Sequence, residues 1–139
     1  MVSLLGLDYG LRRIGVAWGG TSEGLAFALG THVEGRDGSI LEYLDEIIRE
    51  RAVTRIVVGL PLTADGRETD IAARARKFGD RLAAATGLPI VFWDERYSSV
   101  EADRWLATRK KPTKEDRDAM AAEIILQSYL DSLRAGETP

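Results

Sequence analysis

The sequence contains no cysteine and only one histidine among its 139 residues. Disulfide bonds and cysteine zinc sites are therefore excluded. The histidine, His32, falls in an expected strand far along the chain from the acidic residues discussed below, and we assign it no chemistry. A serine or cysteine nucleophile activated by histidine is accordingly not expected. The lack of cysteine agrees with a reducing compartment, and we expect a cytoplasmic protein.

Long hydrophobic runs are also missing. No apolar stretch approaches the roughly 20 residues of a membrane span, and the first residues lack the basic start of a signal peptide. We therefore expect neither a membrane partner nor a secretory signal. The net charge of -3 argues against a nonspecific coat on nucleic acid. It is compatible with an enzyme that acts on nucleic acid through a local basic strip.

The chain length predicts one domain, residues 1–139, with a hydrophobic core of its own. Apolar segments at 3–8, 13–18 and 25–33 are separated by short turns and predict three antiparallel strands. The spacing of apolar residues then becomes helical and alternates with short buried-strand runs. These later elements are a helix from about 39, a strand at 55–62, a helix around 71–82, a strand at 90–96, and helices at about 98–108 and 113–134.

This order of elements predicts an α/β fold. We expect a mixed five-stranded sheet, with three antiparallel strands followed by parallel ones, flanked by helices. Ligand sites in such sheets lie beyond the carboxyl ends of the parallel strands. Residues 107–114 are basic and contain a proline, which predicts a mobile loop. Thr113 and Asp116 resemble a capping box, and residues 135–139 are expected to fray.

Three acidic residues occur where acids are costly. Asp8 ends the first apolar strand, and Glu95 ends the last one. Asp118 precedes Ala122 by four residues and Ile125 by seven, so it lies on the apolar stripe of the last helix. A half-buried carboxylate is unfavourable unless it is paired, hydrogen-bonded or bound to a metal. The three residues are therefore our candidate catalytic and metal-binding side chains.

A divalent cation would remove the repulsion between three such carboxylates. Oxygen ligands favour Mg²⁺ or Mn²⁺, and two ions about 4 Å apart activate water for phosphodiester hydrolysis. Each acid also has a simpler interpretation. Asp8 can accept hydrogen bonds within a turn, Glu95 can pair with a neighbouring arginine, and Asp118 can interact with a helix dipole. The spacing alone does not establish that the three converge.

Basic residues accompany the acids along the sequence. Arginine and lysine are the usual partners of phosphate groups, although at turns they are often only solvated. A flexible basic loop beside the site could also hold a phosphate backbone. The candidate nucleic-acid-binding residues are Arg12, Arg13, Arg96, Arg109, Lys110, Lys111 and Lys114.

Four segments resemble successive motifs of the YqgF/RuvX family. They read "GLDYGLRRIGVA", "VVGLPLTADG", "DERYSS" and "DAMAAEIILQSYLD", and they span nearly the whole chain. One departure is "DERYSS", where a threonine-rich "DERLTT" would be expected. The resemblance implies an RNase H-like fold related to the RuvC resolvase. It also implies a metal-dependent nuclease that matures the 5′ end of pre-16S rRNA. Asp8, Glu95 and Asp118 match the acidic residues of these motifs.

Several functions remain open on the sequence. The leading hypothesis is a two-metal nuclease that acts on RNA, with pre-16S rRNA or a pre-ribosomal particle as partner. The alternative is a Holliday junction resolvase that cuts branched or single-stranded DNA, and paired cutting would require a two-fold dimer. A non-catalytic RNA- or ribosome-binding module is a third hypothesis, and a relative of actin-like ATPases ranks last. The sequence leaves open monomer or homodimer, the metal, and internal or terminal cleavage.

Overall fold

The computed structural model describes residues 2–63, 65–95 and 113–134. The expected helix at about 98–108, loop residues 107–112 and the tail at 135–139 lie outside the described residues. The described elements, in chain order, are β1 (Ser3–Tyr9), β2 (Arg13–Gly20), β3 (Leu25–Val33), α1 (Ile40–Arg51), β4 (Arg55–Leu60), α2 (Asp70–Thr86), β5 (Ile90–Asp94) and α4 (Lys114–Arg134).

The five strands form one mixed sheet in the order β3-β2-β1-β4-β5. Strands β1, β2 and β3 pair antiparallel, whereas β4 pairs parallel with both β1 and β5. The predicted sheet is therefore confirmed. Strand β4 ends at Leu60, two residues earlier than predicted, because Pro61 has no backbone N–H to donate to a neighbouring strand. Leu62 makes only an isolated bridge to Glu68.

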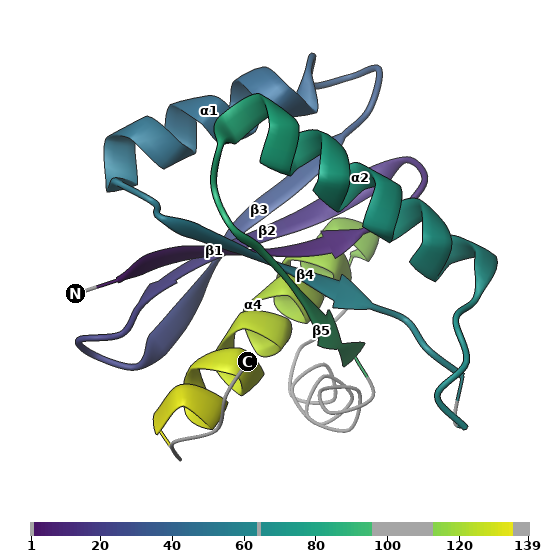
Figure 1. The fold of residues 1–139 in the computed structure, drawn as a ribbon. Helices are drawn as coiled ribbons and strands as arrows, with labels where there is room; N and C mark the ends of the chain where they lie inside the picture. The colour runs from purple at the N-terminus through teal and green to yellow at the C-terminus, as the bar shows by residue number, and fades with distance from the viewer. Residues whose placement is uncertain (1, 64, 96–112, 135–139) are drawn as a thin grey trace.

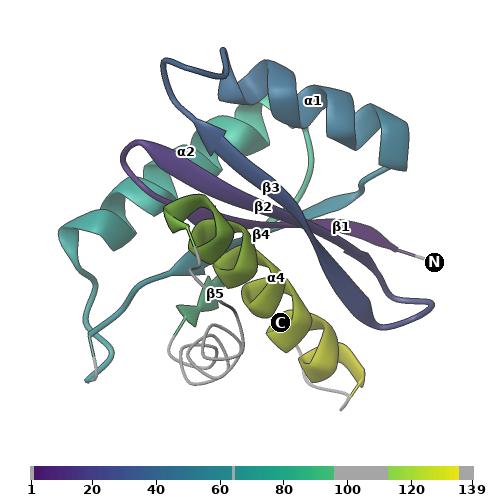
Figure 2. The same cartoon turned by 180° about the vertical axis from the view of Figure 1, so that it is seen from behind.

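Helices cover both faces of the sheet. Helices α1 and α2 lie over one face and α4 crosses the other, as both views show (Figure 1; Figure 2). Leu5 and Leu7 of β1 belong to the core under α1 and α2, and Leu4 belongs to the core under α4. Side chains alternate between the faces of a strand. Asp8 is therefore placed on the α4 face, and Tyr9 on the face of α1 and α2.

Side-chain caps fix where the helices begin. Ser39 and Thr69 accept hydrogen bonds from backbone N–H groups in the first turns of α1 and α2. At α4, the Thr113 hydroxyl accepts from the Asp116 N–H, and the Asp116 carboxylate accepts from the Thr113 N–H. The predicted capping box is confirmed, and it sets the start of the helix that carries Asp118. No helix in the described ranges combines the length and apolar composition that crossing a membrane requires.

Candidate active site

Asp8 and Glu95 meet at the carboxyl end of the sheet. Asp8 is the penultimate residue of β1, and Glu95 follows β5, with β4 between these two strands. The side chains of Asp8 and Glu95 are hydrogen-bonded to each other. Gly59 of β4 makes this contact feasible. A Cβ atom at Gly59 would lie 2.6 Å from Glu95 Oε1 and 2.9 Å from its Cγ, so any side chain there would displace Glu95.

A second glycine places Asp118. Gly15 of β2 is the cross-strand partner of Asp8 in the β1–β2 ladder. A Cβ atom at Gly15 would lie 1.8 Å from the carbonyl oxygen of Asp118. The backbone of α4 therefore rests directly on β2 beside Asp8, an approach that only glycine allows. The structure thus brings the three predicted acids to one end of the sheet, on the α4 face.

The proximity of the acids changes their protonation. Burial is the main cause that raises the pKa of Asp8 well above its usual value, and the charges of Glu95 and Asp118 raise it further. Burial also raises the pKa of Glu95, whereas the hydrogen bond from Asp8 lowers it. A hydrogen bond between two carboxyl groups needs one proton. Burial raises the pKa of both groups, so the two side chains share that proton.

Asp118 is held by an ion pair. Its Oδ2 accepts a hydrogen bond from Nε of Arg13 at 2.7 Å, and both side chains are partly exposed. Arg13 was predicted to contact phosphate, and in the structure its partner is Asp118. A shallow cavity of about 330 Å³ opens beside this pair. It is lined by Gly10, Leu11, Arg12, Arg13, Ile71 and Asp118.

Within the described ranges, no three His, Asp or Glu side chains are arranged to hold a metal ion as they stand. The contacts explain why. Asp8 and Glu95 bind each other, and Arg13 binds Asp118. The donor set nevertheless fits Mg²⁺ or Mn²⁺, because it consists of carboxylate oxygens whose mutual repulsion a hard cation would remove. Asp8, Glu95 and Asp118 would be its ligands once the shared proton and the Arg13 guanidinium were displaced.

Two of the remaining predicted site residues lie within the described ranges. Arg12 is exposed in the β1–β2 turn, and Lys114 is exposed at the first residue of α4. The other four candidates, Arg96, Arg109, Lys110 and Lys111, lie outside the described residues.

Sequence reasoning missed two residues that shape the site, Gly15 and Gly59. Glycine inside a strand signals a close approach of another chain segment. That signal was available at both positions, but it does not say which segment approaches.

Comparisons with known proteins find relatives over nearly the whole chain. A family model described as "RuvX: Holliday junction resolvase" matches residues 2–132. A "Putative pre-16S rRNA nuclease" of Anaeromyxobacter sp. (strain K) is 44% identical over 130 residues, which cover 91% of this chain and 95% of that protein. A relative of the same name from Chloroflexus aggregans (strain MD-66 / DSM 9485) is 41% identical over 135 residues, 95% of each chain.

The solved structure of Thermus thermophilus RuvC in complex with a Holliday junction substrate matches with a TM-score of 0.60. It covers 98% of this chain and 97% of its own at 12% sequence identity, which speaks to the fold alone. The predicted RNase H-like fold is confirmed.

Proposed function

This chain belongs to the RuvX family, and we propose that it is a divalent-metal-dependent nuclease that hydrolyses RNA in the 5′-end maturation of pre-16S rRNA. The observation that carries the proposal is the meeting of Asp8, Glu95 and Asp118 at the carboxyl end of the sheet. The names of the relatives support RNA as the substrate. The clustered acids support hydrolysis, because divalent cations held by carboxylates can activate water for attack on a phosphodiester.

In this proposal Asp8, Glu95 and Asp118 would hold two Mg²⁺ or Mn²⁺ ions, which would supply Lewis-acid stabilisation of the phosphate and a water activated for attack. Asp8 and Glu95 would hold the metal as carboxylates once their shared proton had passed to solvent. Arg13, no longer paired with Asp118, would be available to a substrate phosphate. Arg12 and Lys114, exposed near the same end of the sheet, position the phosphate backbone.

A Holliday junction resolvase is the second candidate. The description of the family and the RuvC complex with a junction favour it. On this alternative the same acids would hydrolyse DNA, and two copies of the chain would cut opposite strands in a symmetric dimer. The two candidates share the site and differ in substrate and assembly.

Cleavage of matched substrates decides between them. RNA spanning the 5′ end of 16S rRNA, single-stranded DNA and a four-way DNA junction would be incubated with Mg²⁺, Mn²⁺ or chelator. Asp8→Asn is the test variant, and Asp80→Asn, an exposed residue of α2, is the matched control. We expect metal-dependent RNA cleavage that falls to background in Asp8→Asn and persists in Asp80→Asn. Paired nicks in the junction with intact RNA would favour the resolvase, and no cleavage with any metal would contradict both.

A further inference from the structure

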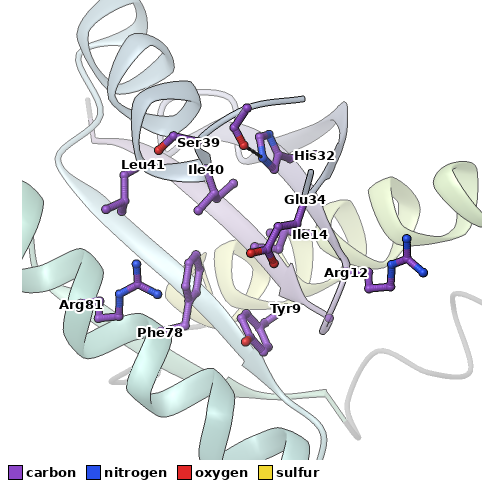
Figure 3. A pocket seen from close by; sticks show the side chains of 12 residues that line it. Tyr9, Arg12, Ile14, His32, Glu34, Ser39, Ile40, Leu41, Phe78 and Arg81 are labelled. Atoms are coloured by element: carbon purple, nitrogen blue, oxygen red, sulfur yellow. Dashed lines mark hydrogen bonds between the residues drawn. The ribbon is translucent and has the colours of Figure 1, made fainter. Parts of the chain in front are cut away.

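A second cavity, of about 220 Å³, lies at the end of β1 on the sheet face opposite to the acids. Residues of β1, β2, β3, α1 and α2 line it, together with the β1–β2 turn and the segment between β3 and α1 (Figure 3). The proposed chemistry uses none of its walls except Arg12. A cavity of about 150 Å³ accommodates benzene, so this one has room for a larger planar ring.

Two aromatic rings and aliphatic side chains form the apolar part of the cavity. The ring centroids of Tyr9 and Phe78 are 5.0 Å apart, and Figure 3 shows the two rings side by side at the cavity. Ile14, which is nearly buried, adjoins them. Aromatic faces of this kind stack unpaired nucleobases in proteins that bind single-stranded RNA. Tyr9 directly follows Asp8, so the cavity begins one residue from the proposed catalytic carboxylates.

Glu34 is the acidic side chain among the residues that line the cavity. Glu34 is exposed to solvent, and Figure 3 shows its carboxylate directed into the cavity beside Ile14. Its backbone N–H donates to the carbonyl of Arg12 at 2.8 Å, which fixes Glu34 to the β1–β2 turn. A carboxylate only accepts hydrogen bonds. Among the four bases of RNA, guanine alone presents two adjacent N–H donors, N1–H and the 2-amino group, on its Watson–Crick edge.

Arginines stand on both sides of the cavity. Arg81 lies on α2 beside Phe78, and the side chain of Arg12 points away from the cavity (Figure 3). Arg12 also lines the shallow cavity beside Asp118. An RNA strand that passes from the acids over the β1–β2 turn to this cavity would therefore meet the guanidinium of Arg12 on its way. Guanidinium groups bind phosphate with two parallel hydrogen bonds.

We propose that this cavity is a subsite for one unpaired guanine nucleotide of the RNA substrate. The base packs against Tyr9 and Ile14, its Watson–Crick edge donates to Glu34, and Arg12 binds an adjoining phosphate. The inference rests on the proposed function, because the strand that fills the subsite is the one that the acids cleave. A free guanine nucleotide has the same chemistry, and the experiment separates the two sources.

Binding without cleavage tests the subsite. Labelled single-stranded uridine oligonucleotides with one central guanine or one central adenine would be titrated in chelator, with guanosine monophosphate as competitor. We expect the guanine oligonucleotide to bind the wild-type protein about tenfold more tightly, the discrimination typical of a good bidentate contact. Glu34→Gln should reduce that preference to about twofold or less. Glu50→Gln, the same charge change at an exposed position of α1, should preserve it.

The sign of the effect excludes a purely electrostatic role for Glu34. Removal of a negative charge near RNA would tighten the binding of both oligonucleotides, whereas loss of a base contact weakens only the guanine one. Equal binding of the two oligonucleotides to the wild-type protein would overturn the proposal. The proposal would also be overturned if guanosine monophosphate bound in the cavity and the guanine oligonucleotide did not displace it. The binding assay contains chelator and no metal, so it does not depend on cleavage. If the nuclease proposal alone fails, the protein will prefer the guanine oligonucleotide but will not cleave RNA in the separate cleavage assay.

Discussion

Replacement of Gly15 by alanine is expected to damage the fold and the site together. The new Cβ would lie 1.8 Å from the Asp118 carbonyl oxygen and 2.3 Å from its carbonyl carbon. The first distance falls about 1.6 Å short of the 3.4 Å of an ordinary contact. Both partners are backbone, so no side-chain rotation relieves the overlap. Overpacking of this kind costs about 1–3 kcal/mol, and we expect a loss near 3 kcal/mol in the free energy of unfolding.

To relieve this overlap, the backbone of α4 must move away from β2, and it carries Asp118 away from Asp8 and Glu95. A misplacement of about 1 Å in a catalytic group costs about 100-fold in rate. We therefore expect single-turnover RNA cleavage by Gly15→Ala with Mn²⁺ to be about 100-fold slower. The rate is measured at a temperature where circular dichroism shows the variant to be folded, and urea titration gives its stability.

Gly19→Ala supplies the matched control. Gly19 lies on the same strand, and a Cβ there would lie 2.6 Å from the backbone oxygen of Leu25 and 3.1 Å from Leu130 of α4. We expect a comparable loss of stability, about 1–3 kcal/mol, with cleavage within about twofold of wild type because the acids stay in place. Equal cleavage rates for the folded Gly15→Ala and Gly19→Ala proteins would refute the argument that Gly15 positions Asp118.

Three further changes test the electrostatics. The raised pKa of Asp8 means that the folded protein holds a proton longer than the unfolded chain, so its stability falls as pH rises from about 4 through that raised pKa. In chelator, Asp8→Asn should reduce this decline, part of which remains because burial also raises the pKa of Glu95. The variant should be the more stable protein at neutral pH, and urea titrations across pH that show a less stable variant would contradict this. Arg13→Gln should cost less than about 1 kcal/mol, because the ion pair is partly exposed. It should tighten Mn²⁺ binding and weaken RNA binding in calorimetry, and unchanged metal affinity would mean that Arg13 does not compete for Asp118. Glutamine at all three positions 109–111 should lower the slope of log Kd against log salt by about 2 for single-stranded RNA, and an unchanged slope would remove these residues from the phosphate contacts.

Much of the fold was predictable because local patterns decide it. Alternating apolar segments located the strands, and the apolar stripe that places Asp118 on the inner face of α4 is a property of that helix alone. The capping box at Thr113 needed only four residues of sequence. These features depend on neighbours a few positions away, where the periods of helix and strand are reliable guides.

The contacts across the site were not predictable in this way. Arg13 and Asp118 are 105 positions apart, and the local pattern around neither residue identifies the other as its partner. The glycines at 15 and 59 could equally have marked bulges or weak strand positions. The proposed guanine subsite combines residues of the "GLDYGLRRIGVA" segment with Glu34 and with residues of α2, which belong to none of the quoted motifs. Such features arise only when the sheet order and the crossing of α4 bring distant segments together.

The contacts of the acids also suggest how metal and substrate binding are linked. In the structure, the proton at Asp8 and the guanidinium of Arg13 offset the negative charge of the three carboxylates. Metal ions would offset the same charge at the same oxygen atoms. In the proposed function, metal ions must displace both. Metal affinity should then rise with pH, because the proton competes for the same oxygen. Displacement also frees Arg13 beside the shallow cavity, where it can bind phosphate. On this proposal, metal binding would prepare the protein for RNA, and by thermodynamic reciprocity RNA that engages Arg13 would favour metal binding.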